Sequence, residues 1–254
     1  MRVNICGVGI DQYSFHEVVE IIVQQALNSS QPEYVVTPNA QHLVTLQKDK
    51  LFREIYRHAF LVVPDGVPLL WAANFLKIPL NGRVNGTDLF EFLCAVAPEK
   101  DLKIFLLGGR PGAADEAAKL LRSRHPRLNI VGTYCPPYGF EKDATELSKI
   151  NQIIKETAPQ LLFVGLGAPK QEKWIYSNYQ ELKVPVSLGI GVSFELVAGT
   201  VQRAPKWMQK TGLEWFFRLL VEPRRLWKRY VFGNSLFLWL VLKQRLGLSD
   251  SQAS

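Results

Sequence analysis

The chain has few cysteines and no pattern that would build a metal site from them. Cys6, Cys94 and Cys135 are odd in number and lie among apolar residues, which predicts reduced, buried thiols rather than a disulfide framework. The four histidines show no metal-ligand spacing among themselves or with a cysteine. We therefore expect no structural zinc.

The sequence also lacks a hydrophobic run long enough to cross a bilayer. Its longest apolar-rich stretch covers residues 230–242 and contains Gly, Asn and Ser, whereas a spanning helix needs about 20 apolar residues. The opening residues, MRVNICGVGIDQ, lack the charged and apolar regions of a signal peptide. We expect no transmembrane span and no signal peptide, although a segment can lie on a membrane surface.

Three phosphate-binding signatures are missing as well. The chain has no G-x-G-x-x-G, no P-loop and no D-x-D triplet. The first absence argues against a nicotinamide-dependent oxidoreductase and the second against an NTPase. Glycosyltransferases that hold a nucleotide diphosphate through Mg²⁺ or Mn²⁺ commonly use a D-x-D triplet, which this chain lacks. If the protein handles a nucleotide sugar, arginine, lysine and backbone N–H groups must neutralise its diphosphate.

Charge is abundant but unevenly placed. The chain has 30 Lys and Arg residues against 23 Asp and Glu, and residues 203–254 hold 10 and 3 of these, which accounts for the whole net charge of +7. The same segment holds four of the six tryptophans. We therefore predict a neutral body, residues 1–202, and a basic, aromatic appendage, residues 203–254, that meets a negative and partly apolar partner.

Short apolar runs alternate with amphipathic stretches throughout the body. The runs are rich in Val, Ile, Leu and Phe without polar alternation, which is typical of parallel strands covered on both faces. They cover residues 3–8, 34–37, 61–64, 103–107, 129–134, 160–166 and 184–190. Helical stretches between them cover residues 15–27, 40–59, 86–97, 113–124 and 144–157. This order predicts an α/β fold, a Rossmann-like and mostly parallel sheet with helices on both faces.

The pattern changes near Gly199. Two helical stretches, residues 205–221 and 223–246, follow without a strand candidate, and Pro223 suits the first position of the second helix. We predict a C-terminal helical appendage on the α/β body.

Polar residues and glycines follow several predicted strands. In an open α/β sheet, ligands bind beyond the carboxyl ends of the strands, so these residues are the candidates for the site. They are Thr37, Asn39, Asp65, Gly108, Gly109, Gly167, Lys170, Gln171 and Glu195, with Arg83 and Asp88 from the stretch GRVNGTDLF.

Each candidate also has a structural interpretation. A carboxylate at the end of an apolar strand, such as Asp65, can have a raised pKa and serve as a general base, or it can cap the helix that starts near Val67. Thr37 and Asn39 can be caps in the same way. Gly108 and Gly109 can admit a phosphate or simply form a tight turn.

The stretch GRVNGTDLF offers the same choice. Thr87 or Asp88 is expected to cap the helix that follows it. Arg83 can clamp a phosphate or carboxylate, or it can be a solvated surface arginine.

Five segments together resemble one glycosyltransferase family. They are TPNAQHLV (37–44), VPDGVPLLWAA (63–73), RVNGTDLF (83–90), FVGLGAPKQEKW (163–174) and GVSFELVAGTVQRAPKW (191–207). In this order they resemble the TagA/WecG/CpsF family of bacterial cell-surface polymer synthesis, over nearly the whole chain. The resemblance implies a metal-independent, inverting transferase without a cofactor, which moves a sugar from a UDP donor to a polyprenyl-diphosphate-linked sugar. N-acetylmannosamine is the sugar in TagA, where the polymer is a teichoic acid.

The resemblance also implies roles for single residues. Asp65 is similar to the family's general base, and Thr37 and Gln171 to residues that orient the substrate. Arg83 corresponds to a residue at the pocket edge. Glu195 falls where the family has an acidic residue, more often Asp, near the uridine. The cations of the family's appendage correspond to Arg203, Arg218, Arg224 and Arg225.

Three alternatives remain open at this point. The donor can carry an N-acetylmannosamine uronic acid or a glucose instead. The chain can be a non-enzymatic basic protein that binds nucleic acid or a membrane, although the body has no nucleic-acid module. A Rossmann-type oxidoreductase would be stabilised by NAD(P). We favour a cytoplasmic enzyme, peripheral on the inner face of the plasma membrane, with an anionic lipid surface as partner and no nucleic acid; its oligomeric state stays open.

Overall fold

The computed structural model describes residues 1–221 and 223–248. These residues form eight strands: β1 (Arg2–Ile5), β2 (Val8–Asp11), β3 (Glu33–Val36), β4 (Leu61–Val62), β5 (Lys103–Gly108), β6 (Asn129–Tyr134), β7 (Leu161–Gly165) and β8 (Val186–Gly189). Strands β3 to β8 form one six-stranded sheet in the order β4-β3-β8-β7-β5-β6, and every pair in it is parallel. The α/β, mostly parallel fold predicted from the sequence is confirmed.

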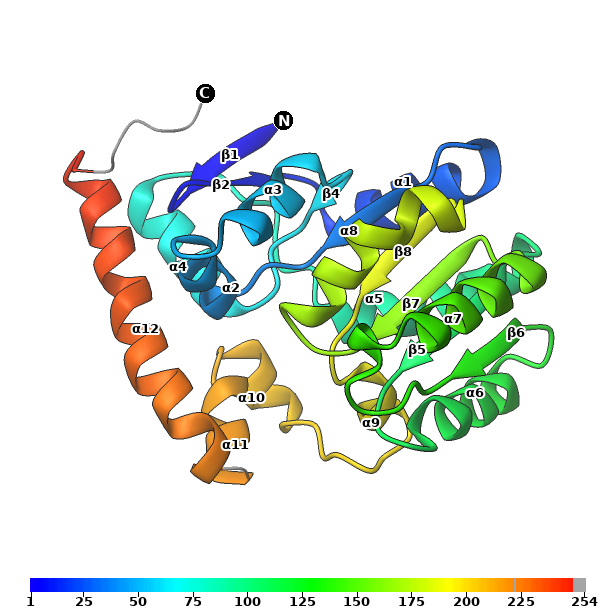
Figure 1. The fold of residues 1–254 in the computed structure, drawn as a ribbon. Coiled ribbons are helices and arrows are strands. Elements are labelled where there is room, and N and C mark those ends of the chain that lie inside the picture. The colour runs from blue at the N-terminus through cyan, green and yellow to red at the C-terminus, as the bar shows by residue number, and fades with distance from the viewer. Residues whose placement is uncertain (222, 249–254) are drawn as a thin grey trace.

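The helices of the body are α1 (Phe15–Asn28), α2 (Ala40–Leu46), α3 (Lys50–His58), α4 (Val67–Leu76), α5 (Gly86–Val96), α6 (Ala113–Arg124), α7 (Ala144–Thr157), α8 (Lys170–Leu182) and α9 (Ser193–Val197). Two 3₁₀ turns cover Ala97–Glu99 and Phe140–Lys142. The C-terminal segment forms α10 (Lys206–Lys210), α11 (Glu214–Val221) and α12 (Pro223–Arg245). Figure 1 shows α12 running along one side of the molecule, with α10 and α11 beside its lower end.

Alternate residues of the central strands enter two separate hydrophobic cores. Phe105 and Leu107 of β5 belong to the core that also contains residues of α2, α3, α4, α7, α8 and α12, whereas Ile104 and Leu106 belong to the core with residues of α1, α5, α6 and α9. All four side chains are fully buried. Both faces of the sheet are therefore covered, which explains why these strands show no polar alternation.

Three of the expected elements are divided differently in the structure. Residues 3–8 were expected as one parallel strand, but β1 and β2 form a separate antiparallel hairpin. Its turn places Cys6 at φ 51° and Gly7 at φ 81°, the left-handed backbone of a two-residue hairpin turn.

The helix expected over residues 40–59 is broken. Asp49 caps α3 by accepting a hydrogen bond from the backbone N–H of Phe52 at 3.0 Å. The helix expected over residues 205–221 is also broken, at Gly212, whose φ is 76°. Helices α8 and α9 were not among the expected stretches.

The appendage packs on the body through α12. Phe237 and Val241 are 4% and 5% exposed and belong to the core that α2 and α4 share. Near the end of α12, Gln244 accepts a hydrogen bond from the Cys6 backbone N–H at 2.6 Å and donates one to the Asn4 carbonyl at 2.8 Å. The end of the described chain is therefore held by the N-terminal hairpin. Among the described residues, no helix combines the length and apolar character needed to cross a membrane.

Candidate active site

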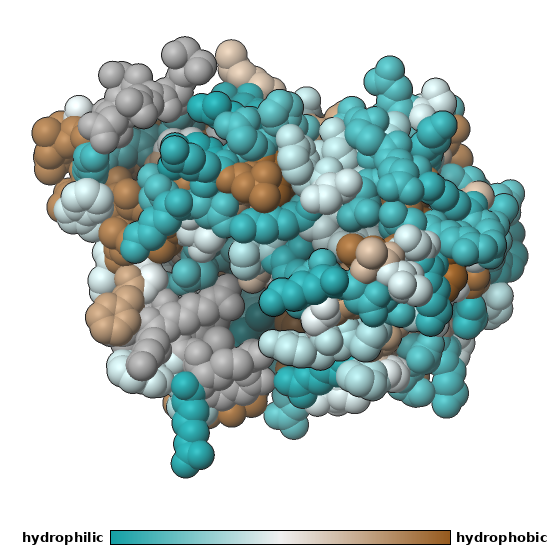
Figure 2. Space-filling view, in the orientation of Figure 1, coloured by the Kyte–Doolittle hydropathy of each residue, from teal (hydrophilic) through white to brown (hydrophobic). Residues whose placement is uncertain are grey.

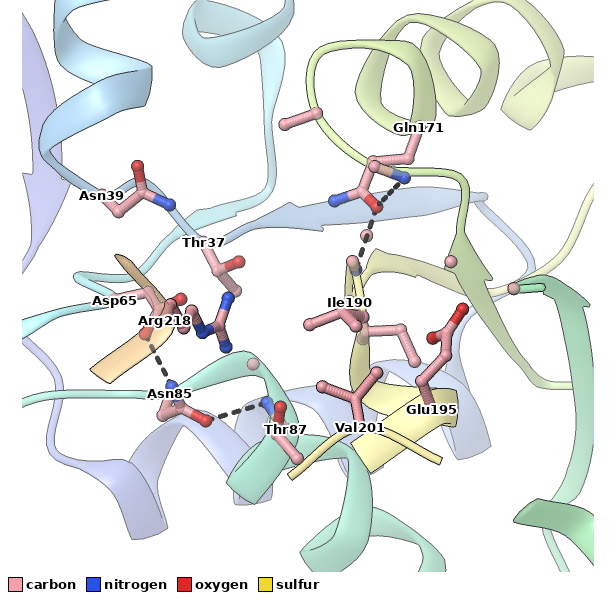
Figure 3. Close-up of a pocket in the computed structure, with 18 of the residues that line it drawn as sticks. Thr37, Asn39, Asp65, Asn85, Thr87, Gln171, Ile190, Glu195, Val201 and Arg218 are labelled. Carbon is pink, nitrogen blue, oxygen red and sulfur yellow. Dashed lines mark hydrogen bonds between the residues drawn. The ribbon is translucent and has the colours of Figure 1, made fainter. Parts of the chain in front are cut away.

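A cavity of about 530 Å³ lies beyond the carboxyl ends of the parallel strands. Its wall includes residues that follow β3, β4, β5, β7 and β8, together with Phe217, Arg218 and Val221 of α11. Eight residues expected at the site line it: Thr37, Asn39, Asp65, Gly109, Gly167, Gln171, Glu195 and Arg218. Figure 3 shows Asp65 and Arg218 together on one side of the cavity and Glu195 on the opposite side.

Asp65 lies at the junction of two cavities. It also lines a smaller cavity of about 180 Å³, whose wall includes Arg83, Glu214 and Trp215. Asn85 donates a hydrogen bond from Nδ2 to Asp65 Oδ1 at 2.9 Å. Burial, and then the nearby Glu214 carboxylate, raise the pKa of Asp65 to about 6, while Arg83, Arg218 and the Asn85 bond lower it. Such a carboxylate can take up a proton near neutral pH.

The capping interpretation of Asp65 is wrong. The N-cap of α4 is Gly66, and it makes no side-chain cap bond. The expectation that Thr87 or Asp88 caps α5 is also wrong, because Asn85 Oδ1 accepts from the backbone N–H groups of both, at 3.0 Å and 3.2 Å. Asn39 does cap α2 in this way, accepting from Gln41 and His42.

Gln171 is buried, and its amide is engaged by the protein. Oε1 accepts from the backbone N–H groups of Gly167 at 3.2 Å and Gly191 at 3.0 Å, so it joins the loops after β7 and β8. Nε2 donates to Glu172 Oε1 at 2.9 Å. A Cβ on Gly189 would lie 2.6 Å from Nε2, so a larger residue at this position would displace the Gln171 amide. Gln171 thus sets the shape of this wall.

Glu195 lines the larger cavity, and one of its two carboxylate oxygens accepts a hydrogen bond from the protein. The Arg110 backbone N–H donates to Glu195 Oε1 at 2.8 Å. Glu195 is 5% exposed, and its Oε2 has no hydrogen-bond partner among the described residues. A buried carboxylate oxygen of this kind is an acceptor for a ligand hydroxyl or N–H group.

The remaining candidates lie outside the larger cavity, as far as the chain is described. Gly108 is a packing position, since a Cβ there would lie 2.8 Å from the Gly165 carbonyl oxygen. Lys170 pairs with Glu141 at 2.9 Å. Asp88 accepts from Arg203 at 2.6 Å, beside the start of α5. Arg224 is exposed, and the side chain of Arg225 lies outside the described part of the structure.

Arg83 is held between the body and the appendage. It lies 3.6 Å from both Asp88 and Glu214, and its side chain is 17% exposed. The interpretation as a solvated surface arginine is therefore wrong. It faces the smaller cavity, next to Asp65.

Sequence reasoning left several polar residues of the larger cavity out of the candidate site, among them Asn85 and His42. His42 is buried, with Nδ1 2.9 Å from the Tyr56 hydroxyl and Nε2 3.5 Å from Asn39 Nδ2. Asn85 stands directly before a helix, where asparagine is a preferred cap, and His42 stands three residues after Asn39 on the same helix face. The cap preference of asparagine and the spacing of His42 from Asn39 could have identified these two residues from the sequence.

The described residues contain no group of three or more His, Cys, Asp or Glu side chains placed to hold a metal ion. The site instead combines three arginines, Arg83, Arg110 and Arg218, with the backbone N–H groups of several strand-end loops. Guanidinium and N–H groups can stabilise an anionic leaving group.

The fold and site define a class of protein. A parallel, doubly wound sheet with a polar cavity across its carboxyl edge is the arrangement of nucleotide-binding α/β enzymes. The model of the glycosyl transferase WecG/TagA/CpsF family matches residues 3–251, and the chain belongs to this family. It is therefore a glycosyltransferase, as the resemblance implied.

Two relatives carry the same name, N-acetylglucosaminyldiphosphoundecaprenol N-acetyl-beta-D-mannosaminyltransferase. The protein from Bacillus subtilis (strain 168) is 35% identical over 196 residues, which is 77% of this chain and 73% of that protein. The protein from Staphylococcus aureus (strain NCTC 8325 / PS 47) is 31% identical over 229 residues, 90% of this chain and 86% of its own length.

Proposed function

We propose that this protein transfers N-acetylmannosamine from a UDP donor to an N-acetylglucosamine carried on undecaprenyl diphosphate, with inversion at the anomeric carbon. The names of the relatives support the transferred sugar and the lipid-linked acceptor. The observation that carries the proposal is the place of Asp65 between two cavities. A general base of a two-substrate transfer must reach both substrates at the point where they meet.

In the proposed reaction, the larger cavity holds the UDP-sugar and the smaller one the acceptor sugar. Asp65 takes the proton from an acceptor hydroxyl while that oxygen attacks the anomeric carbon. The bond from this carbon to the diphosphate oxygen breaks on the opposite face, and UDP leaves with the electron pair. Arg218 and the backbone N–H groups of the strand-end loops stabilise the charge on the diphosphate.

The opposite end of the larger cavity suits the nucleoside. The second oxygen of Glu195 has no hydrogen-bond partner among the described residues, so it can accept from a ribose hydroxyl or a uracil N–H. Metal-independence is part of the proposal, and the positive charge of Arg83, Arg110 and Arg218 supports it.

The reaction is tested with the purified protein, UDP-N-acetylmannosamine and a lipid-diphosphate N-acetylglucosamine analogue, in the presence of EDTA. We expect transfer of the sugar, and we expect UDP to raise the melting temperature without metal. Asp65→Asn should lower kcat by at least about 100-fold, because it removes the base and keeps the shape. Asp101→Asn, on the exposed surface, is the matched control.

Several results would contradict parts of this proposal. Normal turnover by Asp65→Asn would remove Asp65 as the base, and transfer only with added Mg²⁺ or Mn²⁺ would remove metal-independence. Turnover with a UDP-linked uronic acid or UDP-glucose instead would change the donor. Stabilisation by nucleic acid or NAD(P), without any transfer, would favour the other classes considered from the sequence.

We propose further that the appendage places the enzyme on the cytoplasmic membrane surface. Phe232, Leu238 and Trp239 of α12 are 67%, 66% and 54% exposed, and Trp71 and Phe75 of α4 are 53% and 52% exposed. Figure 2 shows hydrophobic side chains along the edge where these helices lie. Basic side chains accompany them: Arg245 lies over the Phe75 ring and Lys243 over the Trp239 ring. An apolar surface edged by cations suits an anionic bilayer, where the lipid-linked acceptor would be found.

A further inference from the structure

Both arginines beside Asp65 are paired with the same carboxylate. Glu214, the first residue of α11, has Oε1 3.3 Å from Arg218 Nη2 and Oε2 3.6 Å from Arg83 Nη1. The Glu214 side chain is only 16% exposed. One carboxylate therefore uses its two oxygens for two guanidinium groups.

Helix stability alone does not explain this arrangement. An acidic residue in a first helical turn is favourable, and Glu214 with Arg218 is an ordinary i,i+4 pair. Arg83, however, comes from the loop before α5 in the body, and its Nη1 also donates to the Gln209 carbonyl at 3.4 Å. The bridge through Glu214 therefore joins the body to the appendage at the wall of the smaller cavity.

The charged side chains around this cavity balance one another. Arg83 and Arg218 are its two cationic wall residues among those described, and Asp65 and Glu214 are its two acidic ones. A diphosphate that enters meets guanidinium groups that are already engaged, with the carboxylate that holds them still in place. It can gain bidentate bonds from these arginines only if Glu214 releases them.

We infer that Glu214 is an internal stand-in for a diphosphate: it keeps Arg83 and Arg218 placed while the site is empty and yields them to the diphosphate group of a substrate. This inference rests on the proposed function, because a UDP-sugar and a polyprenyl-diphosphate acceptor supply that group. Glu214 is thus a positioning residue that works through two arginines. Its release also removes one link between α11 and the body, so binding of the anion and the attachment of α11 are coupled.

The inference is tested by measuring dissociation constants of the full-length protein for UDP, inorganic pyrophosphate and uridine by calorimetry. Glu214→Gln should bind UDP and pyrophosphate about three- to tenfold more tightly, since the competing carboxylate is gone, and should bind uridine as the wild type does. Glu214→Asp keeps the charge but shortens the reach, so an intermediate gain is expected. Glu181→Gln, which removes a remote ion pair with Lys155, should change nothing.

A second background separates competition for the arginines from simple repulsion. If Glu214 acts by holding Arg218, the gain should largely disappear when Glu214→Gln is made in an Arg218→Gln protein. Persistence of the full gain there would mean that Glu214 only repels the anion, and the inference would fall. Unchanged or weaker pyrophosphate binding by folded Glu214→Gln, checked by its melting curve, would overturn it as well.

The same measurements keep the inference apart from the proposed function. If the wild type transfers the sugar but Glu214→Gln binds UDP and pyrophosphate unchanged, only the inference fails. If Glu214→Gln binds pyrophosphate more tightly through Arg218, but the wild type turns over no UDP-sugar, the proposed function fails and the role of Glu214 as a stand-in for a diphosphate holds.

Discussion

At the scale of single residues, the site depends on carboxyl groups whose surroundings change their protonation. Burial raises the pKa of Asp65 to about 6 and that of Glu172 to about 7. Glu172 is 2% exposed and accepts from Gln171, and its Oε2 has no hydrogen-bond partner among the described residues. The two groups allow separate predictions, one for the rate and one for stability.

The rate should follow the ionisation of Asp65. Since only the carboxylate can take up the acceptor proton, kcat/KM should rise with pH through about 6 and level off above it, with a value at pH 5 about tenfold below the plateau. The measurement is the pH profile of transfer, with UDP-sugar binding followed over the same range. A flat profile between pH 5 and 8 would contradict this role for Asp65.

Stability should follow the ionisation of Glu172. Its pKa is about 7 in the folded protein, against an ordinary value of 4.5, so the folded state holds the proton more tightly. The stability from this group is present below pH 4.5 and is lost as pH rises through about 7. Glu172→Gln should therefore become more stable relative to the wild type by roughly 2 kcal/mol between pH 5 and 8. Denaturant unfolding of the wild type and of Glu172→Gln at pH 5 and pH 8 measures this difference. If the unfolding free energies of the two proteins changed equally with pH, the prediction would be wrong.

At the scale of elements, the turn between α10 and α11 decides where α11 closes the cavity. Gly212 has φ 76°, and a Cβ there would lie 2.8 Å from Val67 and 3.0 Å from Trp71. The turn therefore lies directly against α4. This contact places Glu214 and Arg218 beside Asp65, from an element that begins far along the chain.

Gly212→Ala should loosen this turn. It adds both left-handed backbone strain and a clash, so we expect a loss of about 2 kcal/mol or more in unfolding free energy and faster proteolysis after α10. Gly247→Ala is the matched control, because Gly247 has φ 71° with open space around its Cβ position. Equal effects of the two substitutions would mean that the contact with α4 contributes little.

At the scale of the whole molecule, the excess positive charge and much of the exposed apolar surface belong to the same segment of the chain. The positive net charge comes from residues 203–254, and the exposed apolar side chains of α12 belong to the same segment. The active-site cavities also use this segment through Glu214 and Arg218. The proposed attachment to a membrane and the completion of the site therefore depend on the same part of the chain.

Membrane attachment predicts a measurable partition. Leu238→Ser with Leu242→Ser should weaken cosedimentation with anionic phospholipid vesicles by about tenfold or more, because two exposed apolar side chains lose their insertion energy. Leu27→Ser with Leu51→Ser is the matched control, since these side chains are 42% and 47% exposed on other helices. Equal losses in both double variants would argue against α12 as the contact surface.

The sequence by itself determined the order of the six strands of the parallel sheet and of several helices between them, because local apolar periodicity reports how each segment is buried. It also placed Thr37, Asp65 and Gln171 at strand ends, which meet at one edge of any parallel sheet. It could not place the hairpin at Cys6, where a short apolar run reads equally well as one strand.

Only the tertiary structure decided which of these side chains share a wall. In the folded protein, Asn85 donates a hydrogen bond to Asp65, and the Gln171 side chain accepts hydrogen bonds from two loops. Glu214 of the appendage forms an ion pair with Arg83 of the body. The tertiary structure also placed Lys170 in an ion pair with Glu141 and packed Gly108 against the backbone of Gly165. The reason is that side-chain direction, and contact between segments distant in sequence, follow from packing in three dimensions and leave no local pattern in the chain.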